Sequence, residues 1–252
     1  MLFDVENHKF WTGFNMTEPV VALIPARAGS ERVKKKNTRP FAGFEHGLLE
    51  LKLRQLSKVK DISDIIISTN DPVVSDYSNY FRRKFDSRVS VIERPDELGL
   101  SSTSMSDFIR YAATLKKSGT MLMTHVTHPF VTSSVFSDLI AAWNVAEYQG
   151  HDSLVTVTKL HKFIWDEDGP YNYDNSVEKW PRSQDIKPLF EINHAAYLMP
   201  FSKMRELGDR VGDKPCLHEL PESIAMDIDW EDQFKLLEDI AFAKISRGHS
   251  VL

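Results

Sequence analysis

Short apolar runs alternate with longer segments of helical periodicity along most of this chain, and that alternation restricts the possible folds more than any other feature. Runs rich in β-branched residues predict strands, whereas apolar residues three and four positions apart predict helices. The predicted strands are Val20–Ile24, Asp64–Thr69, Val89–Ile92, Thr120–His125, Leu154–Thr158, Ala195–Met199 and Ser223–Ile228. The predicted helices are Leu48–Val59, Pro72–Lys84, Ser106–Lys117, Thr132–Tyr148 and an amphipathic helix from Trp230. This order is typical of an α/β fold with a mostly parallel central sheet flanked by helices.

Composition excludes several other classes of protein. The 252 residues, 42% of them hydrophobic and 27% charged, suit a globular chain with a sizeable core. A formal net charge of −5 disfavours nucleic acid as a partner. The single cysteine, Cys216, excludes a disulfide framework and is interpreted as a packed residue. The apolar runs are too short to span a bilayer and residues 1–16 do not resemble a signal peptide, so we expect a cytoplasmic protein without membrane contact.

We divide the chain into an N-terminal extension, residues 1–16, and one domain, residues 17–252. Within the domain, residues of about 159–193 lack clear periodicity and are rich in Pro, Asp, Tyr and Trp, which predicts an insertion. Its aromatic residues are more typical of an interface or a core than of a surface that stacks on a ligand. These residues are Trp165, Tyr171, Tyr173 and Trp180.

A basic loop follows the first predicted strand, where ligands of open α/β sheets bind. Gly29 allows backbone N–H groups to approach a phosphate, and Ser30 adds a hydroxyl. Positive charge comes from Arg27, Arg32 and Lys36. The loop fits neither of the two common glycine-rich nucleotide patterns, and a solvated basic loop is the alternative interpretation. Its place directly after a buried strand favours phosphate binding.

Two carboxylates, Asp227 and Asp229, lie at the end of the last predicted strand. Residues two apart on a strand point to the same face, so this pair could share one cation. Mg²⁺ suits such a pair because it binds one or two carboxylates and completes its shell with water and substrate phosphates. Alternatively, Asp229 caps the final helix, with Asp232 in the first turn. Combined with a basic phosphate loop, the pair predicts a magnesium site.

Motifs spread over the chain resemble those of the acylneuraminate cytidylyltransferases, the family of the CMP-sialic acid synthetases. The motifs, in order, are Leu23–Ser30 with Lys36-Asn37, Ser68–Asp71, Arg94–Leu98, Pro181–Asp185, Phe190–Tyr197 and Asp227–Asp229. They cover nearly the whole chain from about Val20. The resemblance implies a Rossmann-like nucleotidyltransferase fold with a small inserted dimerisation subdomain, at about residues 159–193. It also implies a homodimer in which one subunit completes the site of the other.

The reaction that the resemblance implies is transfer of CMP from CTP to the anomeric hydroxyl of a sialic-acid-like 2-keto-3-deoxy sugar acid, with Mg²⁺ as cofactor and pyrophosphate as the second product. The catalytic residues would be Arg27, Lys36 and Asp229. The residues that would bind CTP are Ala26, Arg27, Gly29, Ser30, Arg32, Lys36, Asn37, Arg94 and Ser104, the last within Ser101–Ser106. The residues that would bind the sugar acid are His125, Arg182, Gln184 and Asn193, and the metal ligands would be Asp227 and Asp229. The hydroxyl proton could pass to Asp229 or be released through metal coordination, and the sequence leaves both open.

The chain departs from the family pattern mainly on the side of the sugar acid. His125 and Val131 stand where relatives carry Gln and Arg, and His194 replaces a glycine. In the basic loop, Glu31 stands where a basic residue is usual, with Arg32 beside it as a substitute. These departures keep open a different acceptor, such as Kdo, 8-amino-Kdo or a phosphonate. A non-catalytic relative that binds nucleotide is the other alternative.

One further pair, His125 and His128, has H-x-x-H spacing and raises the possibility of a zinc site. The spacing does not place both side chains on one face of a strand, and no third ligand is evident. We therefore interpret His128 as shaping the turn before Pro129, with His125 pointing into the cleft.

Overall fold

The computed structural model describes residues 18–100 and 102–252, and in this part of the chain seven strands form one sheet in the order β3-β2-β1-β4-β8-β5-β9. β1 to β4 are mutually parallel, β8 runs antiparallel between β4 and β5, and β9 is parallel to β5. The strands are β1 (Val20–Pro25), β2 (Ile62–Thr69), β3 (Val89–Glu93), β4 (Thr120–Thr124), β5 (Ser153–Leu160), β8 (Leu189–Pro200) and β9 (Pro215–Glu219). The predicted mostly parallel sheet is confirmed. The expected extension at residues 1–16 and the predicted position Ser101 lie outside the described residues.

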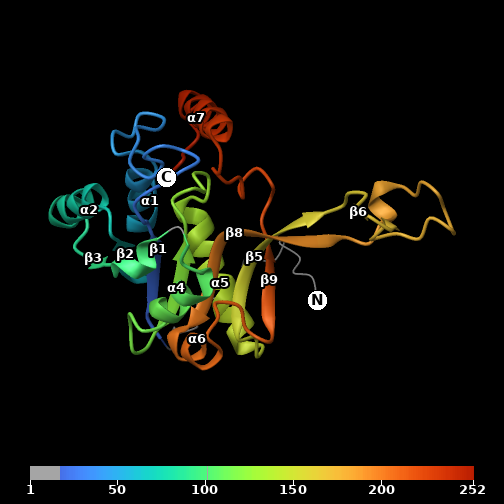
Figure 1. The fold of residues 1–252 in the computed structure, drawn as a ribbon, viewed down its shortest axis with the longest axis horizontal. Helices are drawn as coiled ribbons and strands as arrows, with labels where there is room; N and C mark the ends of the chain where they lie inside the picture. Colours follow the sequence, from blue (N-terminus) through green and yellow to red (C-terminus); the bar gives the residue numbers. More distant parts are fainter. Residues whose placement is uncertain (1–17, 101) are drawn as a thin grey trace.

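Helices pack on both faces of this sheet (Figure 1). Side chains alternate between the faces along each strand, so Ala22 and Ile24 of β1 join one core and Val21 and Leu23 join the other. The first core is covered by α1 (Gly47–Ser57), α2 (Pro72–Lys84), α5 (Ser133–Tyr148) and α7 (Glu231–Ser246). The second is covered by α4 (Met105–Ala112) and α6 (Phe201–Leu207), and a short α3 (Asp96–Gly99) precedes α4. Across the described ranges, no helix combines the length and the apolar character needed to cross a membrane.

Two polar side chains of α1 reach through the first core to the loop after β4. The ammonium group of Lys52, which is fully buried, donates to the carbonyl oxygens of His128 at 3.0 Å and Val131 at 3.4 Å. The amide of Gln55 donates to the carbonyl oxygen of Pro129 at 2.8 Å. Buried backbone carbonyls need such partners where no strand or helix pairs them. These bonds therefore fix the loop at the carboxyl end of β4.

An arm projects from the body between β5 and β8 (Figure 1). It contains a short hairpin, β6 (Trp165–Asp166) and β7 (Gly169–Pro170), and a single 3₁₀ turn, η1 (Ser183–Asp185). Its two sides are held together by the buried amide of Asn172, which donates to the carbonyl oxygens of Lys162 and Lys187, each at 3.0 Å. The predicted insertion is therefore visible as an extension of the β5–β8 pair.

The aromatic residues of this arm are largely exposed. Trp165 is 55%, Tyr171 is 65% and Trp180 is 64% accessible. Of the two interpretations, a core does not apply to these three residues, because no second layer covers them within residues 18–100 and 102–252; an interface stays a prediction. Tyr173 accepts a hydrogen bond from the indole nitrogen of Trp165 at 2.9 Å.

The end of the chain differs from the predicted pattern. Ser223–Ile228 is not a strand: residues 221–225 form a turn in which Ile224 and Ala225 donate to the carbonyl oxygen of Pro221. The alternating apolar residues arise because Ile228 is buried in the core without a strand neighbour. The final helix is capped at Trp230 and not at Asp229, since Gln233 accepts from both of their backbone amides.

Other element boundaries also shift. The helix expected at Ser106–Lys117 ends at Ala112, because the following residues turn toward β4. β9 was not predicted, since its five residues include Pro215 and show little alternation. Cys216 of β9 is buried, as expected for a packed residue.

Candidate active site

The carboxyl ends of β1 to β4 meet at one edge of the sheet. Connections from β1 lead toward β2 on one side, whereas β4 lies on its other side. Ligands of open α/β sheets bind at such a switch point. The basic loop leaves β1 at this point, and His125 leaves β4 beside it.

The end of β2 anchors the basic loop. The backbone amide of Ala28 donates to the side-chain oxygen of Asn70 at 2.9 Å, and the hydroxyl of Thr69 donates to the carbonyl oxygen of Ala26 at 2.6 Å. Asn37, at the far end of the loop, donates from its side chain to the carbonyl oxygen of Arg27 at 3.3 Å. These bonds give the loop a fixed shape and place Ala26 and Asn37 as structural supports of its two ends.

Gly29 and Ser30 lie at the exposed turn of this loop. Gly29 adopts a φ of +77°, a left-handed conformation that glycine reaches without strain. The amides of both residues donate to no acceptor within the described residues. Free backbone N–H groups beside cations are the usual donors to a bound phosphate.

A cavity of about 320 Å³ opens against this loop, a volume in the range of small-ligand pockets. Four of its lining side chains are cationic and one is acidic. The residues are Arg27, Gly29, Ser30, Lys34, Lys35, Lys36, Asn37, Thr38 and Asp71. The lining of the cavity therefore suits an anion, and phosphate binding stays a prediction.

The segment that carries Asp227 and Asp229 lies against the same loop. Its middle residue, Ile228, is buried, donates its amide to the carbonyl oxygen of Thr127 at 3.0 Å, and accepts from the ammonium group of Lys36 at 2.9 Å. Asp229 pairs with Arg32 at 3.0 Å and lies 3.7 Å from the ammonium nitrogen of Lys36. The structure thus joins the two predicted motifs, 192 residues apart in sequence at their closest bond.

Burial and the neighbouring carboxylates have opposite effects on the pKa of Lys36. Burial lowers the pKa of Lys36, whereas the Asp229 and Asp227 carboxylates act in the opposite direction. Arg32 is also held over the indole ring of Trp230, 5.0 Å from the ring centroid. The position of Arg32 agrees with its proposed role as the substitute for the basic residue that Glu31 replaces.

The donor set at Asp227 and Asp229 fits a hard divalent cation. Oδ1 of Asp227 is buried and accepts no hydrogen bond within the described residues, and it lies 3.8 Å from Nε2 of His128. An orphaned carboxylate oxygen two residues from Asp229 is the kind of ligand that Mg²⁺ takes, with substrate phosphates and water completing the shell. Among the described residues no group of three or more His, Cys, Asp or Glu side chains could hold a metal by itself. The pair would therefore depend on a phosphate for its further ligands.

Arg94 adds another buried cation on the second face of the sheet. Its guanidinium donates to the carbonyl oxygen of Ser68 at 2.8 Å and lies 4.3 Å from the ring centroid of Phe108. Burial lowers the pKa of Arg94 to about 10, and the charge of Arg27 contributes to this shift. Arg94 is therefore still charged at neutral pH and lies near Arg27, and its contact with a nucleotide stays a prediction.

Ser104 begins α4. Its hydroxyl accepts from the backbone amide of Asp107 at 3.0 Å and donates to the Asp107 carboxylate at 2.6 Å. These bonds explain a serine at this helix start. Contact of Ser104 with a nucleotide stays a prediction.

Three histidines gather on the β4 and β8 side of the site. His125 is partly exposed, and burial together with the nearby groups His128, Arg210, His194 and Lys36 holds its pKa well below the ordinary range. Burial likewise lowers the pKa of His128, which Asp227 opposes, and of His194. All three rings are neutral at pH 7, so each can donate one hydrogen bond and accept another.

His128 has the structural role that the sequence suggested. Its side chain is fully buried and its Nδ1 atom lies 3.2 Å from the carbonyl oxygen of Ala225. The contact joins the loop after β4 to the turn that precedes Asp227. His128 thereby fixes the backbone just before Asp227, the candidate metal ligand.

The predicted residues for the sugar acid are only partly brought together. Asn193 is buried where the pairing of β8 with β5 is irregular. Its side-chain oxygen accepts from the hydroxyl of Thr156 at 2.7 Å, and its side-chain nitrogen donates to the hydroxyl of Thr158 at 3.1 Å. Arg182 and Gln184 belong to the arm, which projects from the body of the chain (Figure 1), and Arg182 pairs with Asp185 at 2.7 Å. Within a single chain, the arm therefore does not complete this site.

Sequence reasoning missed Arg210, which lies after α6 and near His125 and His194. It is 8% exposed, and its guanidinium stacks 4.0 Å from the ring centroid of Tyr197. Local sequence gives no sign of this role, because Arg210 stands in an irregular segment and reaches β4 and β8 only through the tertiary fold.

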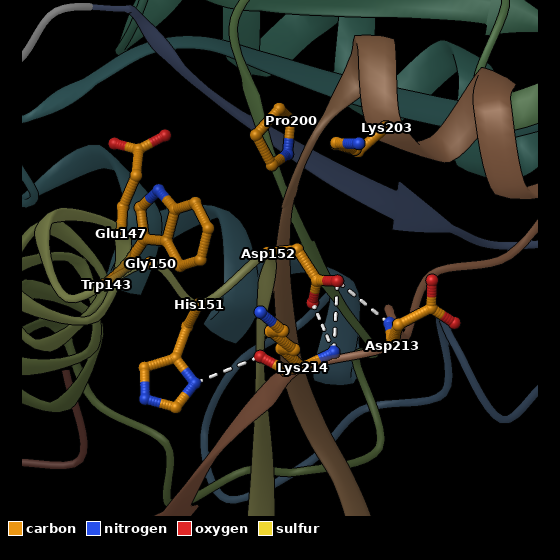
Figure 2. Close-up of a pocket in the computed structure, with 9 residues that line it drawn as sticks. All are labelled: Trp143, Glu147, Gly150, His151, Asp152, Pro200, Lys203, Asp213 and Lys214. Atoms are coloured by element: carbon orange, nitrogen blue, oxygen red, sulfur yellow. Dashed lines mark hydrogen bonds between the residues drawn. The ribbon is translucent and has the colours of Figure 1, made fainter.

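A second cavity, of about 430 Å³, lies at the opposite edge of the sheet, near the start of β5 and β9. Figure 2 shows that the carboxylate of Asp152 accepts hydrogen bonds from the backbone amides of Asp213 and Lys214. The ring of His151 contacts the carbonyl oxygen of Lys214. None of the sequence motifs lines this cavity. The candidate site is therefore the one at the carboxyl edge.

Comparison with known proteins identifies the family and the fold of the chain. The sequence model of the family described as cytidylyltransferase matches residues 21–205. N-acylneuraminate cytidylyltransferases of Streptococcus agalactiae strains NEM316 and A909 are each 22% identical to the chain over 226 residues, which is 85% of this chain and 51% of the relative. The chain thus spans about half the length of the curated relatives it matches.

Solved structures share the fold. 4-Diphosphocytidyl-2C-methyl-D-erythritol synthase from Anaerococcus prevotii superposes with a TM-score of 0.63 at 16% identity, covering 91% of this chain and 97% of that one. A CMP:2-keto-3-deoxy-manno-octonic acid synthetase complexed with CTP superposes with a TM-score of 0.61 at 12% identity, covering 92% and 100%. At these identities the likeness establishes a common architecture.

Proposed function

Because this chain belongs to the cytidylyltransferase family, we propose that it transfers CMP from CTP to the anomeric hydroxyl of a sialic-acid-like sugar acid. One observation carries the proposal: Arg32 and Lys36 of the anion-binding loop meet Asp229 at the switch point of the sheet. Lys36 also lines the cavity, so it links the cations proposed for a triphosphate to a carboxylate proposed for its metal. The names of the two S. agalactiae relatives support a sugar acid as acceptor.

In the proposed reaction the acceptor hydroxyl oxygen bonds to the α-phosphorus of CTP, and the bond from that phosphorus to the α,β-bridging oxygen breaks. Pyrophosphate leaves with the electron pair, and the hydroxyl proton passes to a base, for which Asp229 is our candidate. The protein contributes by positioning the reactants and neutralising charge. Arg27, Arg32 and Lys36, with the free amides of Gly29 and Ser30, would bind the triphosphate.

Asp227 and Asp229 would hold Mg²⁺. When bound, the ion supplies charge neutralisation on the triphosphate. In its absence Asp229 is paired with Arg32, so the metal and the cations compete for the same carboxylate. We propose Mg²⁺ over zinc because oxygen ligands suit a hard cation.

We further propose a homodimer built on the arm. Exposed Trp165 and Trp180 offer an apolar surface on an extension that no layer covers in the described part of the chain. Aromatic side chains of this kind are enriched at protein interfaces. Packing of the arm on a second copy would carry Arg182 and Gln184 to the site of that copy, where a single chain lacks them.

A second candidate is the same transfer to a different acceptor: Kdo, 8-amino-Kdo or a phosphonate. It is favoured by the β4 loop, where His125 and the buried Val131 replace the Gln and Arg of the resembled family. Neutral His125 and an apolar Val131 give a different set of donors from a Gln beside an Arg.

Pyrophosphate release tests the proposal, with CTP and Mg²⁺ against N-acetylneuraminate, legionaminate, pseudaminate, Kdo, 8-amino-Kdo and small phosphonates. We expect release with CTP and one nine-carbon acid, and none when ATP, GTP or UTP replaces CTP. Asp229→Asn should lower turnover by roughly 10²-fold or more, the scale of losing a charge-stabilising group in a transition state. Asp232→Asn is the matched control, because Asp232 contacts only the adjacent Gln233 amide.

Release with Kdo or a phosphonate alone would favour the second candidate. No release with any acid, while CTP still raises the melting temperature, would contradict a transferase acting on these acids. Unchanged turnover in Asp229→Asn would contradict the assignment of Asp229.

A further inference from the structure

Arg210 is a buried cation without a counter-ion. It is 8% exposed, and no carboxylate within the described residues forms an ion pair with its guanidinium. Its hydrogen bonds go to thioether sulfurs, to Met123 at 3.4 Å and to Met105 at 3.9 Å. Sulfur is a weak acceptor, so five N–H donors are left with almost no oxygen to bind.

The nearest acidic residue in sequence favours the charged form of Arg210 without forming an ion pair with it. The Asp209 carboxylate accepts from the backbone amides of Arg210 at 2.6 Å and Val211 at 3.3 Å. That arrangement locks the turn after α6, which ends at Gly208 with a φ of +66°. Asp209 therefore fixes the backbone at Arg210 and only partly offsets the charge of its guanidinium, with which it forms no ion pair.

The guanidinium is held against the acceptor side of the candidate site. It stacks on Tyr197, whose β8 position pairs with Met123 of β4, two residues before His125. The hydroxyl of Tyr197 lies 2.5 Å from Nδ1 of His194. Arg210 is also close enough to His125 and His194 to lower the pKa of both.

The backbone of His194, beside Arg210, is strained. It adopts a φ of +59°, a left-handed conformation that non-glycine residues seldom take. The bulge of β8 opposite Thr156 holds it there. Strained residues held in this way cluster at ligand-binding sites.

We propose that Arg210 binds an anionic oxygen group of the acceptor, a carboxylate or a phosphonate, with His194 and His125 as neutral hydrogen-bonding neighbours. The inference rests on the proposed function and specifies which residue selects the acceptor. A planar guanidinium matches two oxygens of such a group bidentately. It also supplies the positive charge that the β4 loop lacks, since Val131 is buried in the opposite core.

Three variants separate this role from a structural one. Arg210→Met keeps the stem and removes the charge, and Arg210→Lys keeps a charge but loses the fork. Arg205→Met is the matched control, because Arg205 of α6 donates to the carbonyl oxygens of residues Ala113, Lys116 and Lys117 at 2.7–2.9 Å and so has a structural role.

We expect Arg210→Met to raise the acceptor KM by at least about 30-fold, the scale for removing one partner of a buried charged pair, and to leave the KM of CTP unchanged. Its melting temperature without ligand should equal or exceed that of the wild type, because an unpaired buried charge is removed. Arg210→Lys should lie between the two in acceptor KM. Arg205→Met should melt lower, with an unchanged acceptor KM. A lower melting temperature for Arg210→Met with an unchanged acceptor KM would overturn the proposal.

A binding measurement judges Arg210 separately from turnover. Melting temperatures are measured with CTP and EDTA in the presence of N-acetylneuraminate, Kdo or phosphonoacetate, and with the methyl ester of N-acetylneuraminate as the uncharged control. At least one acid should stabilise the wild type and not Arg210→Met, and the ester should stabilise neither; carboxylates and the phosphonate distinguish the two anions. Equal responses of the two proteins, or none in the wild type, would overturn the role of Arg210. If pyrophosphate is never released but the acids stabilise only the wild type, the proposed reaction fails and the anion site stands.

Discussion

Replacing Lys52 by Met should flatten the dependence of stability on pH between pH 7 and pH 9. Lys52 is fully buried in α1, and burial lowers its pKa from 10.5 to about 7. Between these two values the unfolded chain binds a proton that the folded protein does not. The free energy of unfolding therefore rises with pH in this window, from pH 7 up to pH 10.5.

The size of the effect follows from the same two pKa values. Linkage with a folded pKa of about 7 and an unfolded pKa of 10.5 makes this group add about 2 kcal/mol to the free energy of unfolding between pH 7 and pH 9. Two contacts act against the shift: the ammonium group donates to two carbonyl oxygens and lies 4.9 Å from the ring centroid of Phe136. Both contacts favour the charged form of Lys52, so they oppose the lowering of its pKa and limit the gain of about 2 kcal/mol in the free energy of unfolding.

Urea unfolding of the wild type and of Lys52→Met, each at pH 7 and pH 9, measures this contribution. Other titrating groups are common to both proteins, so they cancel in the difference between the two pH responses. We expect the wild type to gain about 2 kcal/mol more than the variant on going to pH 9. Identical pH responses would refute the reasoning and show that the carbonyl oxygens keep Lys52 charged throughout.

Further outcomes follow from other parts of the structure. Excess EDTA should abolish pyrophosphate release and added Mg²⁺ should restore it; activity that persists in EDTA would exclude the metal role of the two carboxylates. Replacing Trp165 and Trp180 together by Ser should convert a dimer to a monomer in light scattering and lower turnover, whereas Leu236→Ser, at a similarly exposed position (53%) on α7, should change neither; a wild type that is itself monomeric would contradict the arm interface. Lys35→Gly should raise the free energy of unfolding by roughly 0.5–1 kcal/mol, because glycine relieves a φ of +52°, while the neighbouring Lys34→Gly should lower it; a loss in both would show that Lys35 is not strained.

Much of the fold was predictable because it depends on local pattern. Apolar periodicity in the sequence predicts β1, β2 and α2, and Pro72 marks the start of α2. Ser223–Ile228 shows the limit of that reasoning: its alternation reflects packing of single residues into a core, which has the same pattern as a strand. Only tertiary contacts, such as the bond from Ile228 to Thr127, distinguish the two.

The candidate site divides in the same way. The basic loop was predictable from its position after the first strand, and the structure brings Arg32 and Lys36 to Asp229. The reason given for pairing Asp227 with Asp229 was wrong, since they do not lie on a strand. Arg210 could not have been found, because its significance lies in the absence of an anion around it, and a sequence does not reveal which charges are compensated.

The pairing of Arg32 and Lys36 with Asp229 has a consequence for how an anion enters the cavity. Arg32 and Lys36 already have an internal counter-ion, so a phosphate that binds to them displaces a carboxylate. Arg27, Lys34 and Lys35 line the cavity without an ion pair among the described residues. Part of the attraction is cancelled in advance by Asp229, and added salt weakens the internal pair as well as the incoming one. The site is therefore expected to bind its anion with a shallower dependence on ionic strength than its number of lysines and arginines would suggest. The carboxylate of Asp229 is therefore expected to lose its partners when an anion fills the cavity.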